Sequence, residues 1–411
     1  MLEGHDIVCF ANDWDSDPLS KKHVMVRLAR ENRVLWVSSL GCRNPTASSR
    51  DVRRAAGKLG AFLRGRRRVA ENLWVTSPLV VPFHGNAAAR RFNRVWLTAS
   101  LRLECRRLGM RRPITWAFLP SAGEVVGSLG ERLVVYHCVD EYSEFTGADA
   151  RAILDMEARL LRRSDVVIVS AEPLLRSKRR LNSDTHLITH GVEVEHFRRA
   201  LDPATPVPEP LRAAAGPVIG FFGLIADWVD LELVAFLARE RPNATFVMVG
   251  KADTDVSMLE RLPNVLLVGR RPYSELPGYC KGFDAAILPF RINELTLAAN
   301  PLKLREYLAA GLPVVATAIP EAQRLAPRVR VARDHAEFLR RLDDVLADVL
   351  ADSSSQARLE TARAMEVESW DHKVEEMSRL VSARLADAVH AAAPRRPAMV
   401  RRATESAGGE V

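Results

Sequence analysis

A run near residue 300 combines an amide, a cation and a carboxylate around the start of one predicted helix. Asn300 is suited to cap the first turn, and Pro301 fits the first helical position, where its missing N–H is not needed. Lys303 adds a positive charge where the free N–H groups of the helix already attract anions. Glu306 lies three residues further on, so its carboxylate shares a face with Lys303. These groups suit a ligand that carries phosphates and hydroxyls, such as a nucleotide-sugar.

The same run has an alternative explanation, because it ends as many ordinary helices do. Gly311 suits the left-handed residue that follows a helix, and Pro313 prevents the helix from continuing. The apolar residues Val314 and Val315 then begin a predicted buried strand. A capped helix of an α/β domain that binds no ligand would show the same pattern.

A second group of polar residues follows the predicted strand Leu133–Tyr136. His137 and Asp140 come directly after this strand, so we expect both at its carboxyl end, where doubly wound sheets bind ligands. An imidazole or a carboxylate there could take the proton of a hydroxyl acceptor, and a carboxylate could stabilise positive charge at an anomeric carbon. We predict His137 and Asp140 as catalytic residues. The alternative is an aspartate that caps the next helix and a histidine satisfied within the core.

Arg291 lies at another expected strand end, after Leu288-Pro289-Phe290. A guanidinium is suited to pair with phosphate oxygens, so we predict that Arg291 binds the phosphates of a ligand. A solvated loop arginine is the alternative.

The histidines and cysteines predict no metal site and no bound cofactor. His186 and His190 lie four residues apart, but on a predicted strand and turn rather than on one helix face. The 5 cysteines are scattered and form no C-x-x-C pair, which indicates reduced thiols in a cytoplasm. No apolar run reaches the roughly 18 residues that span a bilayer. The first residues are acidic where a secretory signal would be basic. We therefore expect a cytoplasmic protein.

Short apolar runs typical of strands alternate with helical patterns along most of the chain. Most of these runs are continuously apolar, as expected for parallel strands covered on both faces. The expected strands are Ile7–Phe10, Val34–Val37, Leu73–Thr76, Ile114–Phe118, Leu133–Tyr136, Val166–Val169, His186–Thr189, Val218–Phe222, Thr245–Val249, Val265–Val268, Ala285–Leu288, Pro313–Ala316 and Val329–Val331. The alternation predicts an α/β protein with two doubly wound, Rossmann-like domains that face a central cleft.

Prolines just before residue 216 interrupt any regular element and mark the expected boundary between these domains. We expect an N-terminal domain at 1–200, a linker at 201–216, a C-terminal domain at 217–365, a further helix at 366–388 and a disordered tail at 391–411.

The positive charge is concentrated in one region. Residues 50–112 carry 16 Lys and Arg against 3 Asp and Glu, a surplus of 13 that exceeds the net charge of +8 of the whole chain. Two amphipathic helical patterns lie there, Val52-Ala55-Ala56-Leu59-Phe62 and Phe92-Val95-Trp96-Ala99-Leu103. An apolar stripe of this kind is usually core, but the arginines favour an anionic membrane surface as a partner. Nucleic acid is not expected as a partner, because no aromatic stacking motif or zinc finger accompanies the charge.

Taken in order, these motifs resemble glycosyltransferases of the GT-B fold, most of all the family 4 type of bacterial surface-polysaccharide synthesis. Residues 301–315 are similar to the donor-site helix of that family. Glu306 matches the second glutamate of the family's E-x7-E motif, which holds the nucleotide ribose. Gly220-Phe221-Phe222-Gly223 resembles the loop where backbone N–H groups approach the diphosphate.

Further parts of the chain extend the resemblance. Residues 157–170 resemble the helix and strand that close the acceptor domain, and His190-Gly191-Val192 is similar to the turn before the linker. Trp370 resembles an aromatic residue of the C-terminal helix, which in the family crosses back onto the first domain. In place of the first glutamate of E-x7-E this chain has Ala298, and Glu294 is the nearest acid.

The resemblance implies a nucleotide-sugar donor in the second domain and an acceptor in the first. The implied donor-binding residues are Gly223, Arg291, Glu294, Asn300, Lys303 and Glu306. The implied acceptor-binding residues are Asp13, Lys22 and His23, with Arg43 nearby. Retention of the anomeric configuration and independence of divalent ions are also implied.

The sequence therefore predicts transfer of a sugar from a nucleotide-sugar to a glycan or lipid-linked acceptor, at the inner face of the plasma membrane. Three alternatives stay open. They are a nucleotide-sugar 2-epimerase on the same fold, a non-catalytic membrane or polysaccharide-assembly scaffold, and a nucleic-acid-binding module that uses residues 50–112.

Overall fold

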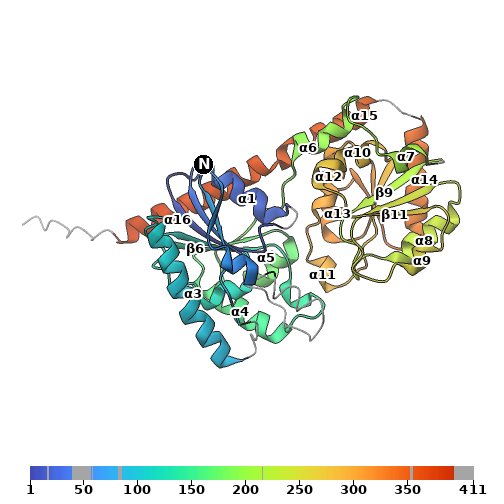
Figure 1. Cartoon of the computed structure of the whole chain (residues 1–411). Coiled ribbons are helices and arrows are strands. Elements are labelled where there is room, and N and C mark those ends of the chain that lie inside the picture. Colours follow the sequence, from blue (N-terminus) through green and yellow to red (C-terminus); the bar gives the residue numbers. More distant parts are fainter. Residues whose placement is uncertain are drawn as a thin grey trace, which may run out of the picture.

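The computed structural model describes residues 1–15, 18–38, 57, 59–81, 86–214, 216–351 and 355–392. The chain forms two α/β bodies, each with its own sheet, and a long C-terminal helix that runs along the first body (Figure 1). Arg43, most of the first amphipathic pattern and nearly all of the predicted tail lie outside the described residues.

The N-terminal sheet contains eight strands in the order β3-β4-β2-β1-β5-β6-β7-β8. They are β1 (Asp6–Ala11), β2 (Arg33–Ser38), β3 (Arg67–Ala70), β4 (Leu73–Thr76), β5 (Ile114–Ala117), β6 (Leu133–Cys138), β7 (Val166–Val169) and β8 (Thr185–Leu187). All neighbours are parallel except β3 and β4, so β3 is an antiparallel edge strand that the sequence analysis missed. Its alternation of half-buried and exposed residues fits an edge position.

The C-terminal sheet contains six parallel strands in the order β11-β10-β9-β12-β13-β14. They are β9 (Val218–Phe222), β10 (Thr245–Val249), β11 (Val265–Gly269), β12 (Ala285–Leu288), β13 (Val314–Thr317) and β14 (Val329–Ala332). Strand order reverses beside β1 in the first sheet and beside β9 in the second. Doubly wound sheets bind ligands at such places, beyond the carboxyl ends of the strands.

The helices of the N-terminal body are α1 (Ser20–Leu28), α3 (Ala87–Arg107), α4 (Ala150–Arg163) and α5 (Glu172–Lys178), and the next helix, α6 (Val194–Arg198), packs in the apolar cluster of the second body. Those that follow are α7 (Glu209–Arg212), α8 (Leu231–Glu240), α9 (Ser257–Glu260), α10 (Leu276–Lys281), α11 (Glu294–Leu297), α12 (Leu302–Ala309), α13 (Pro320–Arg324), α14 (His335–Ala351), α15 (Ser355–Arg363) and α16 (Trp370–Ala392). None of the helices in the described ranges combines the length and apolar character that a bilayer crossing requires.

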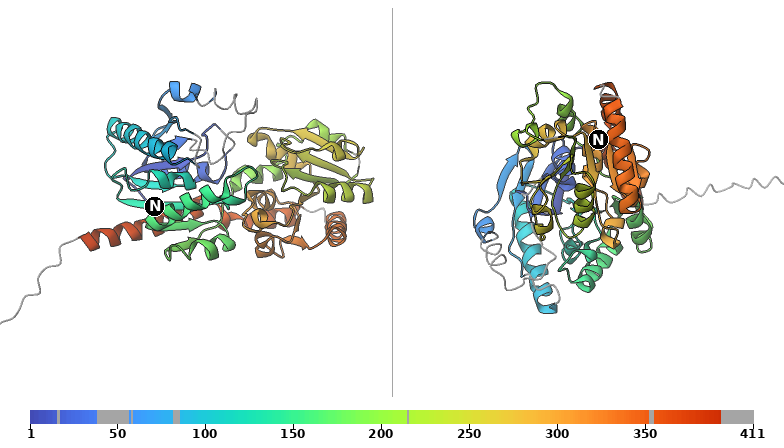
Figure 2. Two further views of the ribbon diagram at one scale, coloured as in Figure 1. Left: turned by 90° about the horizontal axis from the view of Figure 1, so that it is seen from below. Right: turned by 90° about the vertical axis from the view of Figure 1, so that its right-hand side faces the viewer.

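Two separate apolar clusters cover the two faces of the N-terminal sheet. Helices α1 and α16 pack on one face and α3 packs on the other, whereas α4 contributes residues to both clusters (Figure 2). In α3 the buried residues are Asn93, Leu97, Leu101 and Cys105. The stripe that begins at Phe92 therefore points to solvent, and its explanation as core is wrong.

Helix α16 returns to the first domain at a close approach between two segments of the chain, one at Gly191 and the other at Trp370, where α16 begins. A Cβ atom built on Gly191 would lie 2.8 Å from the Cα atom of Trp370. The N–H of Val192 donates to the carbonyl of Glu368, 2.9 Å away, and the N–H of Trp370 donates back to Val192 at 3.2 Å. Trp370 itself is buried in the cluster under α1. The last helix therefore ties the second domain to the first.

Candidate functional site

Helix α12 begins one residue later than its sequence predicts, and Asn300 does not cap it. The N-cap residue is Pro301, and no side chain accepts a hydrogen bond from the first turn. The amide of Asn300 points elsewhere: its Nδ2 donates to the carbonyl of Ser170 at 2.6 Å, and its Oδ1 accepts from Arg305 at 2.8 Å. The N–H groups at the start of α12 therefore remain without a side-chain cap, which is the condition for an anion site.

Gly223 and Lys303 occupy the space in front of this helix start. Gly223 directly follows β9 and has φ of 133°, a backbone conformation that favours glycine. A Cβ atom built there would lie 1.9 Å from the Cε of Lys303 and 2.6 Å from its Nζ. The N–H of Phe222 donates to the hydroxyl of Tyr307 at 2.9 Å, which holds the end of β9 against α12. Glycine is thus favoured at position 223 by its backbone conformation, and a larger residue would also displace the end of the Lys303 side chain.

Lys303 and Glu306 are charged groups without direct partners in the described part of the chain. The ammonium of Lys303 lies 5.8 Å from the ring of Phe221 and 5.9 Å from that of Phe290, and no carboxylate of a described residue lies within ion-pair distance. Burial lowers the pKa of Lys303, although the charge of Glu306 opposes the shift. Burial also raises the pKa of Glu306 to about 7, and Lys303 opposes that shift. Glu306 is buried and Lys303 is half-buried, and neither has gained a direct partner among the described residues, as expected of a site that binds a ligand.

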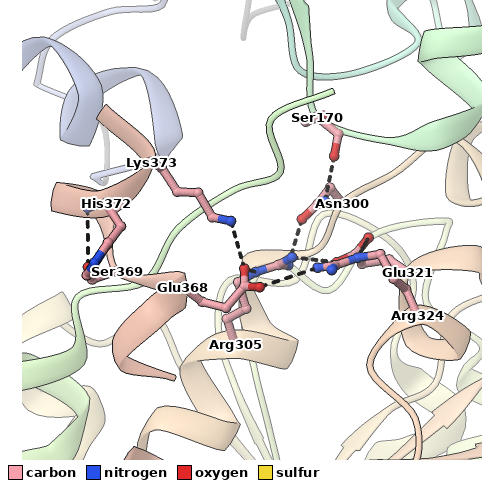
Figure 3. A network of polar contacts seen from close by, with 9 residues as sticks. All are labelled: Ser170, Asn300, Arg305, Glu321, Arg324, Glu368, Ser369, His372 and Lys373. Carbon is pink, nitrogen blue, oxygen red and sulfur yellow. Dashed lines mark hydrogen bonds and ion pairs between the residues drawn. The ribbon is translucent and has the colours of Figure 1, made fainter. Parts of the chain in front are cut away.

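Arg305 lies between these two residues in sequence and has the opposite environment. It is fully buried, and each of its nitrogens has an acceptor (Figure 3). Nε donates to Glu368 at 3.0 Å, one terminal nitrogen to Asn300 at 2.8 Å, and the other to Glu321 at 2.6 Å. Through Asn300 and the carbonyl of Ser170 the network reaches the end of β7 in the first domain.

Two further cations complete this network. Arg324 donates to the carboxylate of Glu321 at 2.8 Å, and Lys373 of α16 lies 3.2 Å from that of Glu368. Burial would raise the pKa of Glu368, but the charges of Arg305 and Lys373 outweigh this effect, so its pKa is lowered. The network therefore joins α12, α13 and α16 as ionised, paired groups.

The facing edge of the N-terminal sheet carries Asp140 and Lys21. Asp140 follows β6 and is half-buried, and burial raises its pKa to about 6, with Lys21 opposing and Glu141 adding to the shift. Lys21 lies in the first turn of α1, where its Nζ donates to Asn12 at 3.0 Å and stands 5.4 Å from the ring of Tyr142. A carboxylate that titrates near neutrality beside a buried cation is suited to exchange a proton.

His137 lies deeper than the sequence analysis expects. Strand β6 extends to Cys138 rather than ending at Tyr136, so His137 is a strand residue with no exposed surface. Its ring lies 4.8 Å from that of Phe118, and neither ring nitrogen has a hydrogen-bond partner among the described residues. Burial lowers its pKa well below the usual value, and His190 adds to this effect. The histidine is therefore neutral here.

The three predicted acceptor-binding residues have different surroundings. Asp13 is exposed two residues beyond the carboxyl end of β1. Lys22 points to Trp14, donating to its carbonyl at 3.2 Å and standing 4.6 Å from its ring. His23 is buried, stacks on Trp370 at 5.2 Å and lies 2.8 Å from the carboxylate of Glu193. His23 is thus held in the contact between α1 and α16.

Arg291 and Glu294 are exposed residues around the start of α11. Arg291 lines a hollow of about 170 Å³ together with Asp227 and Asp255. Ala298, at the position of the family's first glutamate, is buried in the apolar cluster of the N-terminal domain. The segment that precedes α12 therefore makes a contact between the domains.

Two residues that matter in this arrangement were not selected from the sequence. In the sequence, Lys21 is one of several polar residues before and within the start of α1. Only the position of the first turn of α1 at the edge of the sheet distinguishes it from Lys22. Arg305 was treated only as part of a helix pattern. Within the described residues, no three His, Cys, Asp or Glu side chains gather closely enough to hold a metal ion.

Comparison with known proteins places this geometry in context. Residues 216–348 match the profile of the family described as glycosyl transferases group 1. A Bacillus subtilis (strain 168) protein, TuaH, is named as a glycosyltransferase of teichuronic acid biosynthesis. It is 31% identical over 256 residues, which cover 57% of this chain and 63% of the relative. The chain thus spans less than two thirds of the length of that relative.

Solved structures match nearly the whole chain. Sucrose-phosphate synthase from Thermosynechococcus elongatus superposes with a TM-score of 0.69 at 15% identity, covering 93% of this chain and all of that one. The Anabaena protein HepE, in complex with UDP and glucose, superposes with a TM-score of 0.64 at 14% identity, over 92% and 100% of the two chains. The predicted GT-B fold is confirmed by these structures, and residues 216–348 are similar to the glycosyl transferases group 1 family. The narrower family 4 type stays a prediction.

Proposed function

We propose that this protein is a glycosyltransferase that moves a sugar from a nucleotide-sugar to a hydroxyl acceptor. One observation carries the proposal: a half-buried lysine, Lys303, and a buried carboxylate, Glu306, stand without direct partners among the described residues at the uncapped start of α12. A helix start with an adjacent ammonium attracts a diphosphate. A carboxylate one turn further can accept hydrogen bonds from ribose hydroxyls.

In the proposed donor complex, the diphosphate lies between Gly223 and the first turn of α12. The missing side chain at Gly223 leaves room for the backbone and the ammonium of Lys303 to approach the phosphate oxygens. Arg291 and Glu294 are proposed to contact the sugar-phosphate part after donor binding. Because both ends of its amide are already engaged, Asn300 is proposed to position α12 rather than to touch the donor.

The acceptor is proposed to bind at the N-terminal edge, near Asp13 and Asp140. The carboxylate of Asp140 would accept the proton of the acceptor hydroxyl, while the hydroxyl oxygen forms a bond to the anomeric carbon and the bond to the diphosphate breaks. Lys21 would then hold the acceptor oxygens and keep part of the Asp140 population ionised. His137, neutral and buried, is proposed to shape this edge and to donate a hydrogen bond only if the cleft closes.

The leaving diphosphate needs positive charge, which Lys303 and the dipole of α12 are placed to supply. We therefore infer transfer that does not need a divalent ion, and expect the rate to survive EDTA. Retention of configuration is supported by the resemblance in the donor helix. A glycan or lipid-linked intermediate of a surface polysaccharide is the proposed acceptor, in line with the name of the Bacillus relative. The cytoplasmic side of the membrane is the proposed location.

Calorimetric titration of the full chain with UDP, GDP, ADP and their sugars tests the donor site. One of these ligands should bind, and Lys303→Ala and Glu306→Ala should each weaken its binding at least tenfold without lowering the melting temperature. Arg239→Ala and Glu240→Ala are matched controls, since both side chains are exposed on α8. Binding that neither site variant alters would place the nucleotide elsewhere.

Product analysis then separates the alternatives. Incubation of the bound nucleotide-sugar alone should leave the sugar unchanged, whereas an epimerase would isomerise it without an acceptor. If no nucleotide or nucleotide-sugar binds at all, the proposed function is wrong.

A further inference from the structure

We propose that the exposed face of α3 docks on an anionic lipid surface. The inference deepens the proposed function, because it names the surface from which a lipid-linked acceptor would be taken. Lipid binding is measured without sugar transfer, so the two proposals can fail separately.

The apolar residues of this face are exposed although α3 has a second, buried apolar face. Phe92, Val95, Trp96 and Leu103 have exposed fractions of 58%, 66%, 39% and 46%. Their spacing of three and four residues places them on one side of the helix, together with Ala99. The opposite side, with Leu97 and Leu101, is buried against the sheet. The exposed stripe is therefore not needed to attach α3 to the domain.

Arginines surround the same face. The exposed ones are Arg91, Arg94, Arg102, Arg106 and Arg107. Arg107 pairs with Glu104 at 2.8 Å, and Arg102 donates to the carbonyl of Ser128. Arg91, Arg94 and Arg106 form no ion pair with any residue in the described ranges. Apolar and aromatic side chains interleaved with unpaired arginines match the boundary between lipid headgroups and acyl chains.

A second exposed segment lies at the C-terminal end of α3. Leu59 and Leu63 have exposed fractions of 49% and 74%. Three residues after Leu63, Arg66 donates to the carboxylate of Glu104 on α3 at 2.7 Å. This contact places the second segment, with its exposed leucines, next to the C-terminal end of α3.

The location of α3 leaves the proposed donor and acceptor groups free. The helix packs on the face of the N-terminal sheet opposite to α1 and α16, and on the side of that domain away from the C-terminal domain (Figures 1 and 2). A lipid surface at α3 would therefore not cover α12. An occupant with negative charge and apolar depth fits the face, which favours lipid over nucleic acid, since phosphates alone would not use Val95 or Leu103.

Flotation of the full chain with vesicles tests the docking surface. Vesicles of phosphatidylcholine with 30% phosphatidylglycerol should carry the protein, and vesicles of phosphatidylcholine alone should not. The variant Phe92→Ser/Val95→Ser/Trp96→Ser and the variant Arg91→Glu/Arg94→Glu/Arg106→Glu should each bind at least tenfold less. The matched controls are Leu350→Ser, on an exposed residue of α14, and Arg239→Glu on α8, and both should bind like the unaltered chain.

Three results would overturn the inference. They are absence of binding to anionic vesicles, equal binding by the altered and unaltered chains, and a dimer in size-exclusion chromatography that the serine variant converts to a monomer. The last result would assign the face to a second copy of the chain. Unchanged melting temperature and nucleotide affinity of the variants establish that folding and the donor site are intact. If the unaltered chain binds vesicles but no nucleotide, the proposed function is wrong and the docking surface is still supported.

Discussion

Neighbouring charged residues on α12 differ in whether they are paired. The comparison separates a residue that maintains the structure from residues that are available to a ligand. Arg305 is fully buried with three acceptors at 2.6–3.0 Å, and it connects three helices. Glu306, one residue after it, is also buried, and Lys303, two residues before it, is half-buried, yet neither has a direct partner in the described ranges. A paired buried charge maintains structure, whereas an unpaired one costs stability and is kept for a ligand.

Among the described residues, the edge of the N-terminal sheet also has a paired and an unpaired carboxylate, on the adjacent residues Glu141 and Asp140. Glu141 accepts from the buried ammonium of Lys178 at 2.7 Å, and Glu157 accepts from the same ammonium at 2.8 Å. Asp140, next in sequence to Glu141, has no such partner and a pKa raised to about 6 by burial. In both domains, therefore, a structural ion pair stands beside a charge that remains available.

The largest expected effect is on stability and comes from removing the paired charge, Arg305. Arg305→Met should lower the free energy of unfolding by about 3–5 kcal/mol, because it leaves Glu321 and Glu368 buried without their shared cation. Lys303→Met should cost less than about 1 kcal/mol, since it removes a charge that has no partner. Urea unfolding of both variants measures the difference. Equal losses would mean that Lys303 is structural too.

Asp140→Asn tests whether the unpaired carboxylate acts in the reaction. The transfer rate should fall roughly a hundredfold, as expected for loss of a general base, while nucleotide affinity stays unchanged. In the unaltered chain the rate should rise as the pH passes through about 6, where Asp140 ionises. Glu144→Gln is the control, because Glu144 is exposed nearby. A rate that Asp140→Asn leaves intact would assign the base to another group.

Gly223→Ala sharpens the view of the donor side. The new methyl group would displace Lys303, so nucleotide affinity should fall at least tenfold, and backbone strain should lower stability by roughly 2 kcal/mol. Gly269→Ala isolates the strain, because Gly269 also has a positive φ of 75° but no atom within 4 Å of the added position. Calorimetry on both variants separates the two causes. A similar loss of affinity in Gly269→Ala would contradict the proposed role of Gly223.

Glu306→Gln gives the smallest expected effect, and its sign follows from the raised pKa. A carboxyl whose pKa rises on folding, here to about 7, stabilises the protein below its unfolded value and loses that contribution as the pH rises through 7. Between pH 5.5 and 8 the unaltered chain should therefore lose roughly 1–2 kcal/mol that Glu306→Gln does not lose. The nucleotide affinity of the unaltered chain should rise over the same pH range, because the Glu306 carboxylate forms there. Parallel curves for the two proteins would show that Glu306 does not titrate there.

Local sequence rules predicted those features that depend on a few consecutive residues. Continuous apolar runs indicated the parallel strands, and Gly311 and Pro313 indicated the end of α12, because turn geometry and burial act over short distances. The same rules failed where a distant residue competes for a group. Asn300 was expected to cap α12, but Arg305 and Ser170 engage its amide instead.

Helix α3 illustrates a related limit. Its sequence has two apolar stripes, and periodicity alone does not tell which one meets the sheet. Leu97 and Leu101 pack inward, while Phe92 and Val95 are exposed. Which stripe of α3 is buried depends on how well its side chains fit the surface of the sheet, and the helix sequence does not contain the shape of that surface.

By itself the sequence determined the two-domain α/β architecture, the helix α12 with Lys303 and Glu306, and a concentration of arginine in one region. Only the tertiary structure decided which charges are paired, how deep His137 lies, and which face of α3 meets solvent. The physical reason is that helix and strand patterns arise from neighbouring residues, whereas pairing and burial of a charge depend on groups that the fold brings from far along the chain.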